Sequence, residues 1–131
     1  MENCNQIPQE IGDGEYLYRG VVEVNWDDER QRPSSATFKD SLGVSVDRDA
    51  SREKEECINR LINFKSFKAI CRVTALAVRS ADAVAKYMPT EDNIYHSEIH
   101  NTEDKIPLSG GKANRIREQS EVVYLDTSGK E

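Results

Sequence analysis

Residues 68–79, KAICRVTALAVR, restrict the fold more than any other segment, because they are apolar at both odd and even positions. Side chains of a strand alternate between the two faces of a sheet. A strand with two apolar faces has to be covered on both sides, so the segment predicts a central strand. Its alanines leave a helix as the alternative.

Further strands are predicted where β-branched and aromatic residues alternate with polar ones. These segments are 15–26, 42–49 and 94–100, with a short strand at 36–40. Residues 81–87 predict either a helical turn or a short edge piece. The proline and serines of RPSS, just before 36–40, predict a turn.

Two segments carry helical patterns. Residues 49–64 begin with acids and continue with an apolar stripe, and residues 111–125 predict a helix or a helix that passes into a strand. Together these elements predict a single α+β domain with a mainly antiparallel sheet and two or three helices. The domain is expected to span 15–125, with a flexible leader at 1–14 and a disordered tail at 126–131.

Length and composition favour a soluble intracellular protein. The 131 residues suffice for one core, 32% of them are charged, and no apolar run approaches the ~20 residues that span a bilayer. The N-terminus lacks the basic and apolar regions of a secretory signal, which predicts a cytoplasmic location. Cys4, Cys57 and Cys71 form no CxxC pair, so we expect reduced thiols and no structural zinc.

The charge distribution bears on possible partners. A net charge of −6 argues against broad nucleic-acid binding, because phosphate neutralisation needs clustered cations. Residues 52–79, however, hold seven bases against three acids. Such a face could meet a protein partner or a small anionic ligand, and the alternative is a solvated helix face.

The motif YHSEIH contains both histidines of the chain. On a strand, His96, Glu98 and His100 point to the same face, and imidazoles with a carboxylate can bind a metal. His96 and His100 would lie ~13 Å apart on a straight strand, too far for one ion. A metal at His96 and Glu98 would therefore need a ligand from elsewhere, and the alternative is a polar strand face.

The motif VSVDR places Ser45 and Asp47 opposite the apolar Val44 and Val46. Serine and aspartate are poor strand formers, so they need either exposure or partners. The two predicted partners of Asp47 are His96 and Arg19. Two nearby aromatic residues, Trp26 and Phe38, are expected to be buried in one neighbourhood as anchors of the sheet.

The order of these motifs resembles that of a group of small, functionally uncharacterised prokaryotic proteins. In that group a tryptophan is followed by Ser-Ser-x-x-Phe, Leu-Ser-Val-Asp and Asn-Pro-x-His-Ala-x-Ile elements. This chain has Val44, Ile94 and Ser97 where the group has leucine, proline and alanine. The resemblance supplies no activity, but it implies that the motif residues lie together: Trp26, Ser34, Ser35, Phe38, Ser45, Asp47 and His96.

A second resemblance is to the Arg–Ser–Glu pattern of mono-ADP-ribosyltransferases. It implies that Arg19, in LYRG, binds the phosphates of NAD, that a serine supports the cofactor, and that Glu98 acts on the ribose. The chain lacks the Ser-Thr-Ser strand of that family, and Glu98 has no acidic residue two positions before it.

The leading hypothesis is a small binding or accessory module with a polar cleft near the Ser-Ser and Ser-Val-Asp elements. The alternatives are NAD or nucleotide chemistry and a metal-dependent enzyme. The sequence identifies no cofactor or oligomeric state. Candidate catalytic residues are Arg19, Ser45, Asp47, His96 and Glu98. Candidate ligand-binding residues are Trp26, Ser34, Ser35, Asp47 and His96.

Overall fold

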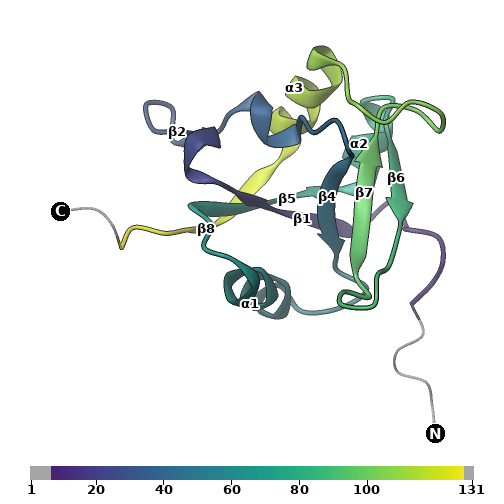
Figure 1. Ribbon diagram of the computed structural model, residues 1–131, viewed down its shortest axis with the longest axis horizontal. Coiled ribbons are helices and arrows are strands. Elements are labelled where there is room, and N and C mark those ends of the chain that lie inside the picture. The colour runs from purple at the N-terminus through teal and green to yellow at the C-terminus, as the bar shows by residue number, and fades with distance from the viewer. Residues whose placement is uncertain (1–6, 129–131) are drawn as a thin grey trace, which may run out of the picture.

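Six antiparallel strands form one sheet in the order β6-β7-β4-β1-β5-β8 in the computed structural model, which describes residues 7–128 (Figure 1). A separate hairpin joins β2 to β3. The α+β architecture with a mainly antiparallel sheet is confirmed. The strands are β1 Tyr16–Val21, β2 Trp26–Asp27, β3 Arg32–Pro33, β4 Val44–Arg48, β5 Ala69–Thr74, β6 Val84–Tyr87, β7 His96–His100 and β8 Glu121–Leu125.

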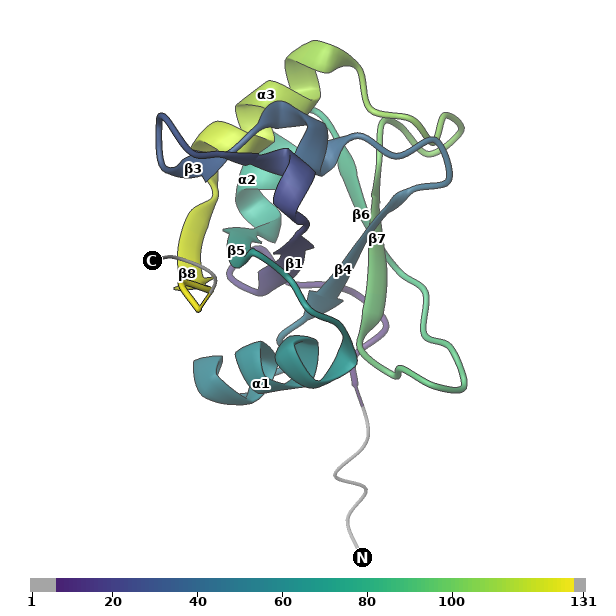
Figure 2. The same ribbon diagram turned by 60° about the vertical axis from the view of Figure 1, so that its left-hand side comes forward.

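Helices cover the two faces of this sheet unequally. In Figure 2, α1 lies below the sheet, while α2 and α3 lie above it. No helix within residues 7–128 is long and apolar enough to cross a membrane. The α-helices are α1 Lys54–Phe64, α2 Ala75–Ser80 and α3 Gly110–Gln119, and two 3-10 helices are η1 Glu23–Asn25 and η2 Ser35–Phe38.

Strand alternation builds a separate core on each face. In β1, Leu17 and Val21 enter the larger core, which lies on the side of α2 and α3. Tyr18 enters a smaller core with Ile70 and with residues of α1. Among the described residues, this smaller core takes nothing from β4 or β7, so α1 leaves that half of the face uncovered.

The predicted strand at 68–79 is correct only in its first half. Thr74 ends β5, and its hydroxyl accepts a hydrogen bond from the Ala77 amide, which caps α2. The cap and the alanines favour the helix that was left as the alternative. Residues 81–87 hold the edge strand β6, and 111–125 hold a helix that passes into β8.

The short strand predicted at 36–40 is wrong. The carbonyl of Ser34 accepts a hydrogen bond from the Thr37 amide, and the segment forms the 3-10 helix η2. The strand predicted at 15–26 also ends early, at Val21. The expected burial of Trp26 and Phe38 is confirmed, because both belong to the larger core.

An ion pair fastens the N-terminal segment to the sheet. The Arg48 guanidinium, 1% exposed, donates to both carboxylate oxygens of Glu15 at 2.6 and 2.9 Å. It also donates to the carbonyls of Pro8 and Glu10. Ile11 is buried. The described part of the expected leader, residues 7–14, therefore packs on the domain.

We expect Glu15→Gln to lower the free energy of unfolding by about 3 kcal/mol, because it leaves the buried Arg48 charge without its counter-ion. The matched control is Asp13→Asn, since Asp13 pairs with Arg79 at the surface and exposed pairs contribute about 1 kcal/mol or less. Urea unfolding of both variants measures the difference. Equal decreases in the free energy of unfolding would show that the Arg48–Glu15 pair stabilises the fold no more than an exposed ion pair.

Candidate functional site

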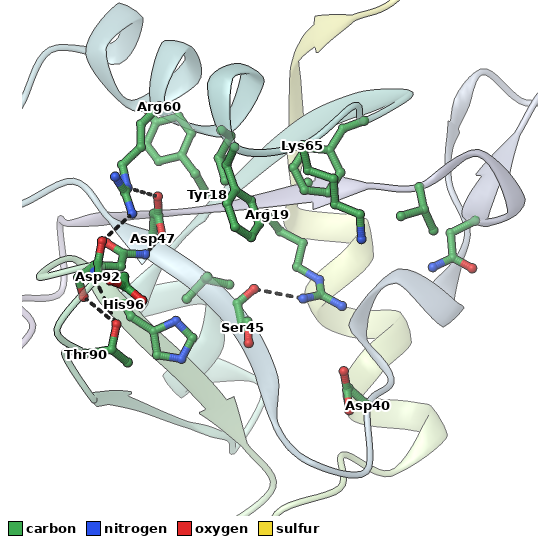
Figure 3. Close-up of a pocket in the computed structure, with 18 residues that line it drawn as sticks. Tyr18, Arg19, Asp40, Ser45, Asp47, Arg60, Lys65, Thr90, Asp92 and His96 are labelled. Carbon is green, nitrogen blue, oxygen red and sulfur yellow. Dashed lines mark hydrogen bonds and ion pairs between the residues drawn. The ribbon is translucent and has the colours of Figure 1, made fainter.

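A cavity of about 550 Å³ lies where α1 leaves the sheet uncovered (Figure 3). Its floor comes from β1, β4 and β7, one wall comes from α1, and the opposite wall comes from the loop between β6 and β7. This volume is within the range of small-molecule sites. We call this cavity the cleft.

One end of the cleft is cationic. Arg19 donates from Nε to the Thr37 carbonyl and from Nη1 to the Ser45 carbonyl, each at 2.9 Å. It forms no ion pair with any carboxylate in the part of the chain that the structure describes. Burial lowers the pKa of Arg19, and nearby Asp40 raises it by less. Lys65, which follows α1, adds a second positive charge, and Asp40 contributes one negative charge to the same end (Figure 3).

At the other end of the cleft, Arg60 is paired with Asp47 but imperfectly bonded to it, and Asp92 adds a second carboxylate. Asp47 is 5% exposed, and its Oδ1 accepts a hydrogen bond from the side-chain amide of Asn93 at 2.8 Å. Arg60 Nε lies 3.3 Å from Asp47 Oδ2, yet the two buried atoms make no hydrogen bond. A 3.4 Å bond from Arg60 Nη2 to the Asp92 carbonyl is also long. This guanidinium therefore keeps unused donors beside the cleft.

Apolar side chains line the middle of the cleft. Tyr18 and Leu61 belong to the smaller core, and Phe64 and Phe67 extend the apolar surface toward the opening. A Cβ on Gly20 would overlap the ring of Phe67, so this ring lies directly on the backbone of β1. Any larger residue at Gly20 would displace the ring.

A carboxylate flanked by two imidazoles lies on β7. Glu98 bonds through Oε2 to His96 Nε2 at 3.2 Å and through Oε1 to His100 Nε2 at 2.8 Å. Burial raises the pKa of Glu98, but the bonds from His100 and His96 lower it by more. Gly43, at φ 109°, leaves no room for a Cβ beside Glu98. The carboxylate therefore holds His96, which lines the cleft.

The structure brings together four of the candidate residues of the sequence analysis. Arg19, Ser45, Asp47 and His96 all line the cleft. Glu98 supports His96 from outside the lining. The remaining three candidates lie apart from the cleft, since the Trp26 side chain is in the larger core, Ser34 caps η2 and Ser35 begins it.

The predicted partners of Asp47 need correction. His96 is its neighbour across β4 and β7, but the carboxylate bonds to Asn93 and pairs with Arg60. His96 bonds to Glu98, and Arg19 bonds to backbone carbonyls. Arg60 and Phe64 were missed as site residues. The basic run at 52–79 contained Arg60 but did not indicate which face of the helix meets the sheet.

No group of three or more histidine, cysteine, aspartate or glutamate side chains within residues 7–128 could hold a metal ion. Both described cysteines, Cys57 and Cys71, are free and buried, and burial raises their pKa values to about 11 and about 12. Cys4 lies outside the described residues.

Comparison of the chain with protein-family models, curated proteins and solved structures found no match.

We expect Glu98→Gln to lower stability at pH 7 by about 1 kcal/mol, because hydrogen bonds to an ionised group are lost. The folded-state pKa of Glu98 is depressed, so its contribution is present above the unfolded pKa and is lost as the pH falls through the folded value. The difference in stability between the wild-type protein and Glu98→Gln should therefore disappear at acidic pH. Thermal unfolding from pH 7 to pH 3 measures it, with exposed Glu103→Gln as the control. If the stability difference between the wild type and Glu98→Gln instead grows steadily down to pH 3, this role of Glu98 is contradicted.

Proposed function

We propose that the protein is a small intracellular binding module whose cleft takes a small ligand with an anionic group. The anion binds at the end formed by Arg19 and Lys65. The Ser45 hydroxyl, on an exposed residue of the cleft floor, is available as a further donor. Ser45 and Asp47 of the Ser-Val-Asp element line this cleft, whereas Ser34 and Ser35 of the Ser-Ser element do not.

The unpaired charge of Arg19 is the observation that carries this proposal. Two backbone carbonyls hold the side chain in place, yet it forms no ion pair within residues 7–128, and Asp40 acts on it only as a nearby charge. A partly dehydrated charge without a counter-ion is costly. An anionic ligand would remove that cost, and the planar guanidinium has remaining N–H donors that suit phosphate or carboxylate oxygens.

The arrangement supports binding more directly than it supports NAD chemistry. Arg19 donates to the backbone carbonyl of Ser45, which holds its guanidinium beside β4, and both residues line the cleft. The role that the ADP-ribosyltransferase resemblance implies for Glu98 has less support, because each of its oxygens bonds to a histidine and it does not line the cleft.

We expect inorganic phosphate to bind the wild-type protein at the cationic end and to shift the amide NMR signals of β1 and β4. Arg19→Gln and Lys65→Gln should each weaken the affinity by about tenfold, the scale of one hydrogen bond to a charged group. Titrations at low salt measure this effect, because salt screens it.

Lys54→Gln is the matched control, since Lys54 is exposed at the opposite end of α1 and does not line the cleft. Circular dichroism verifies that each variant is folded. The proposal fails if phosphate does not bind, or if Lys54→Gln weakens binding as much as Lys65→Gln.

A further inference from the structure

The aromatic rings beside the cationic end restrict what kind of anion the cleft suits. Phe64 is the last residue of α1, and 72% of its surface is exposed although it lines the cleft. A large ring left in water at the opening of a cavity is an unused contact surface. Inorganic phosphate would not cover it.

Phe67 adds a second aromatic surface beside this opening of the cleft. Its ring packs on Gly20, the residue after Arg19 in β1. Lys65 Nζ lies 5.8 Å from the ring centroid. Arg19, Lys65 and Phe67 all line the cleft, so one molecule can contact all three.

The far end of the cleft is polar without a strong net charge. Figure 3 shows Arg60, Asp47 and His96 on one side and Lys65 and Arg19 on the other. Because Asp47 offsets the charge of Arg60 and Asp92 adds a further carboxylate, this end suits a neutral polar group better than a second anion. The Arg60 side chain is 33% exposed, and its N–H groups other than the buried Nε can bond to such a group.

We propose that the ligand is a ring-bearing anion: a phosphate or carboxylate joined to a flat ring with neutral polar groups on its far edge. The anion binds Arg19 and Lys65, the ring packs against Phe64 and Phe67, and the far edge reaches Arg60. This inference rests on the proposed function and adds the class of ligand. A hydroxyl-rich sugar phosphate would place its hydroxyls against apolar walls, which disfavours it.

Three probes separate the anion from the ring: inorganic phosphate, glucose 6-phosphate and phenyl phosphate. We expect phenyl phosphate to bind about tenfold more tightly than the other two, because only its ring gains the aromatic contacts. Phe64→Ala should reduce the affinity for phenyl phosphate by about three- to tenfold and leave that for inorganic phosphate unchanged. Calorimetric titration measures each affinity.

Ile62→Ala is the matched control, because Ile62 is a partly exposed apolar residue of the same helix, 40% exposed, that does not line the cleft. Failure of all three probes to bind would overturn the proposed function itself. If phosphate binds but phenyl phosphate binds no better than glucose 6-phosphate, the inference of a ring-bearing ligand is wrong, whereas the proposed anion site still stands. A preference for phenyl phosphate that survives Phe64→Ala would also overturn the inference.

Discussion

The length of α1 limits how much of the sheet can be covered on its face. Eleven residues of helix reach about 16 Å, whereas a sheet of six strands is about 24 Å wide between its outer strands. One such helix crossing the strands cannot cover them all. It packs on Tyr18 and Ile70, and the same face of β4 and β7 stays open. The cleft is the space beside the helix.

This partial cover of the sheet explains why apolar and polar residues alternate along β4. Val44 and Val46 enter the larger core, which α2 and α3 close. Ser45 and Asp47 face the open side, where polar groups can meet a ligand or each other. Asp47 and Arg60 form an ion pair there. Arg19 forms none with any carboxylate within residues 7–128, and two backbone carbonyls hold it instead.

Local patterns were enough to predict the strands around the cleft and the helix beside it, although this helix begins at Lys54 and not at residue 49. The period-two alternation of VSVDR identified Ser45 and Asp47, and YHSEIH identified His96. Patterns of this kind report on one segment at a time. They did not reveal that Thr74 would cap a helix, nor that Ser34 would begin a 3-10 turn, because both depend on local hydrogen bonds that compete with strand formation.

The site was predicted only in part for a related reason. Arg60 and Phe64 reach the cleft because of how α1 is rotated and placed on the sheet. Those two quantities depend on packing against the sheet, including Tyr18, which is distant in sequence from the helix. Trp26 was grouped with the site by motif order, but its large apolar side chain was more stable in the core.

The alternation of β4 also affects how this protein could change over generations or in the laboratory. Substitutions at Val44 and Val46 would disturb the core, and one at Arg48 would release the N-terminal segment. Ser45 contributes its side chain to the cleft alone, and Phe64 is largely outside the core. Selection for a new ligand could therefore act on these two positions while the scaffold keeps its stability. The fold separates the residues that make it stable from those that are free to diversify.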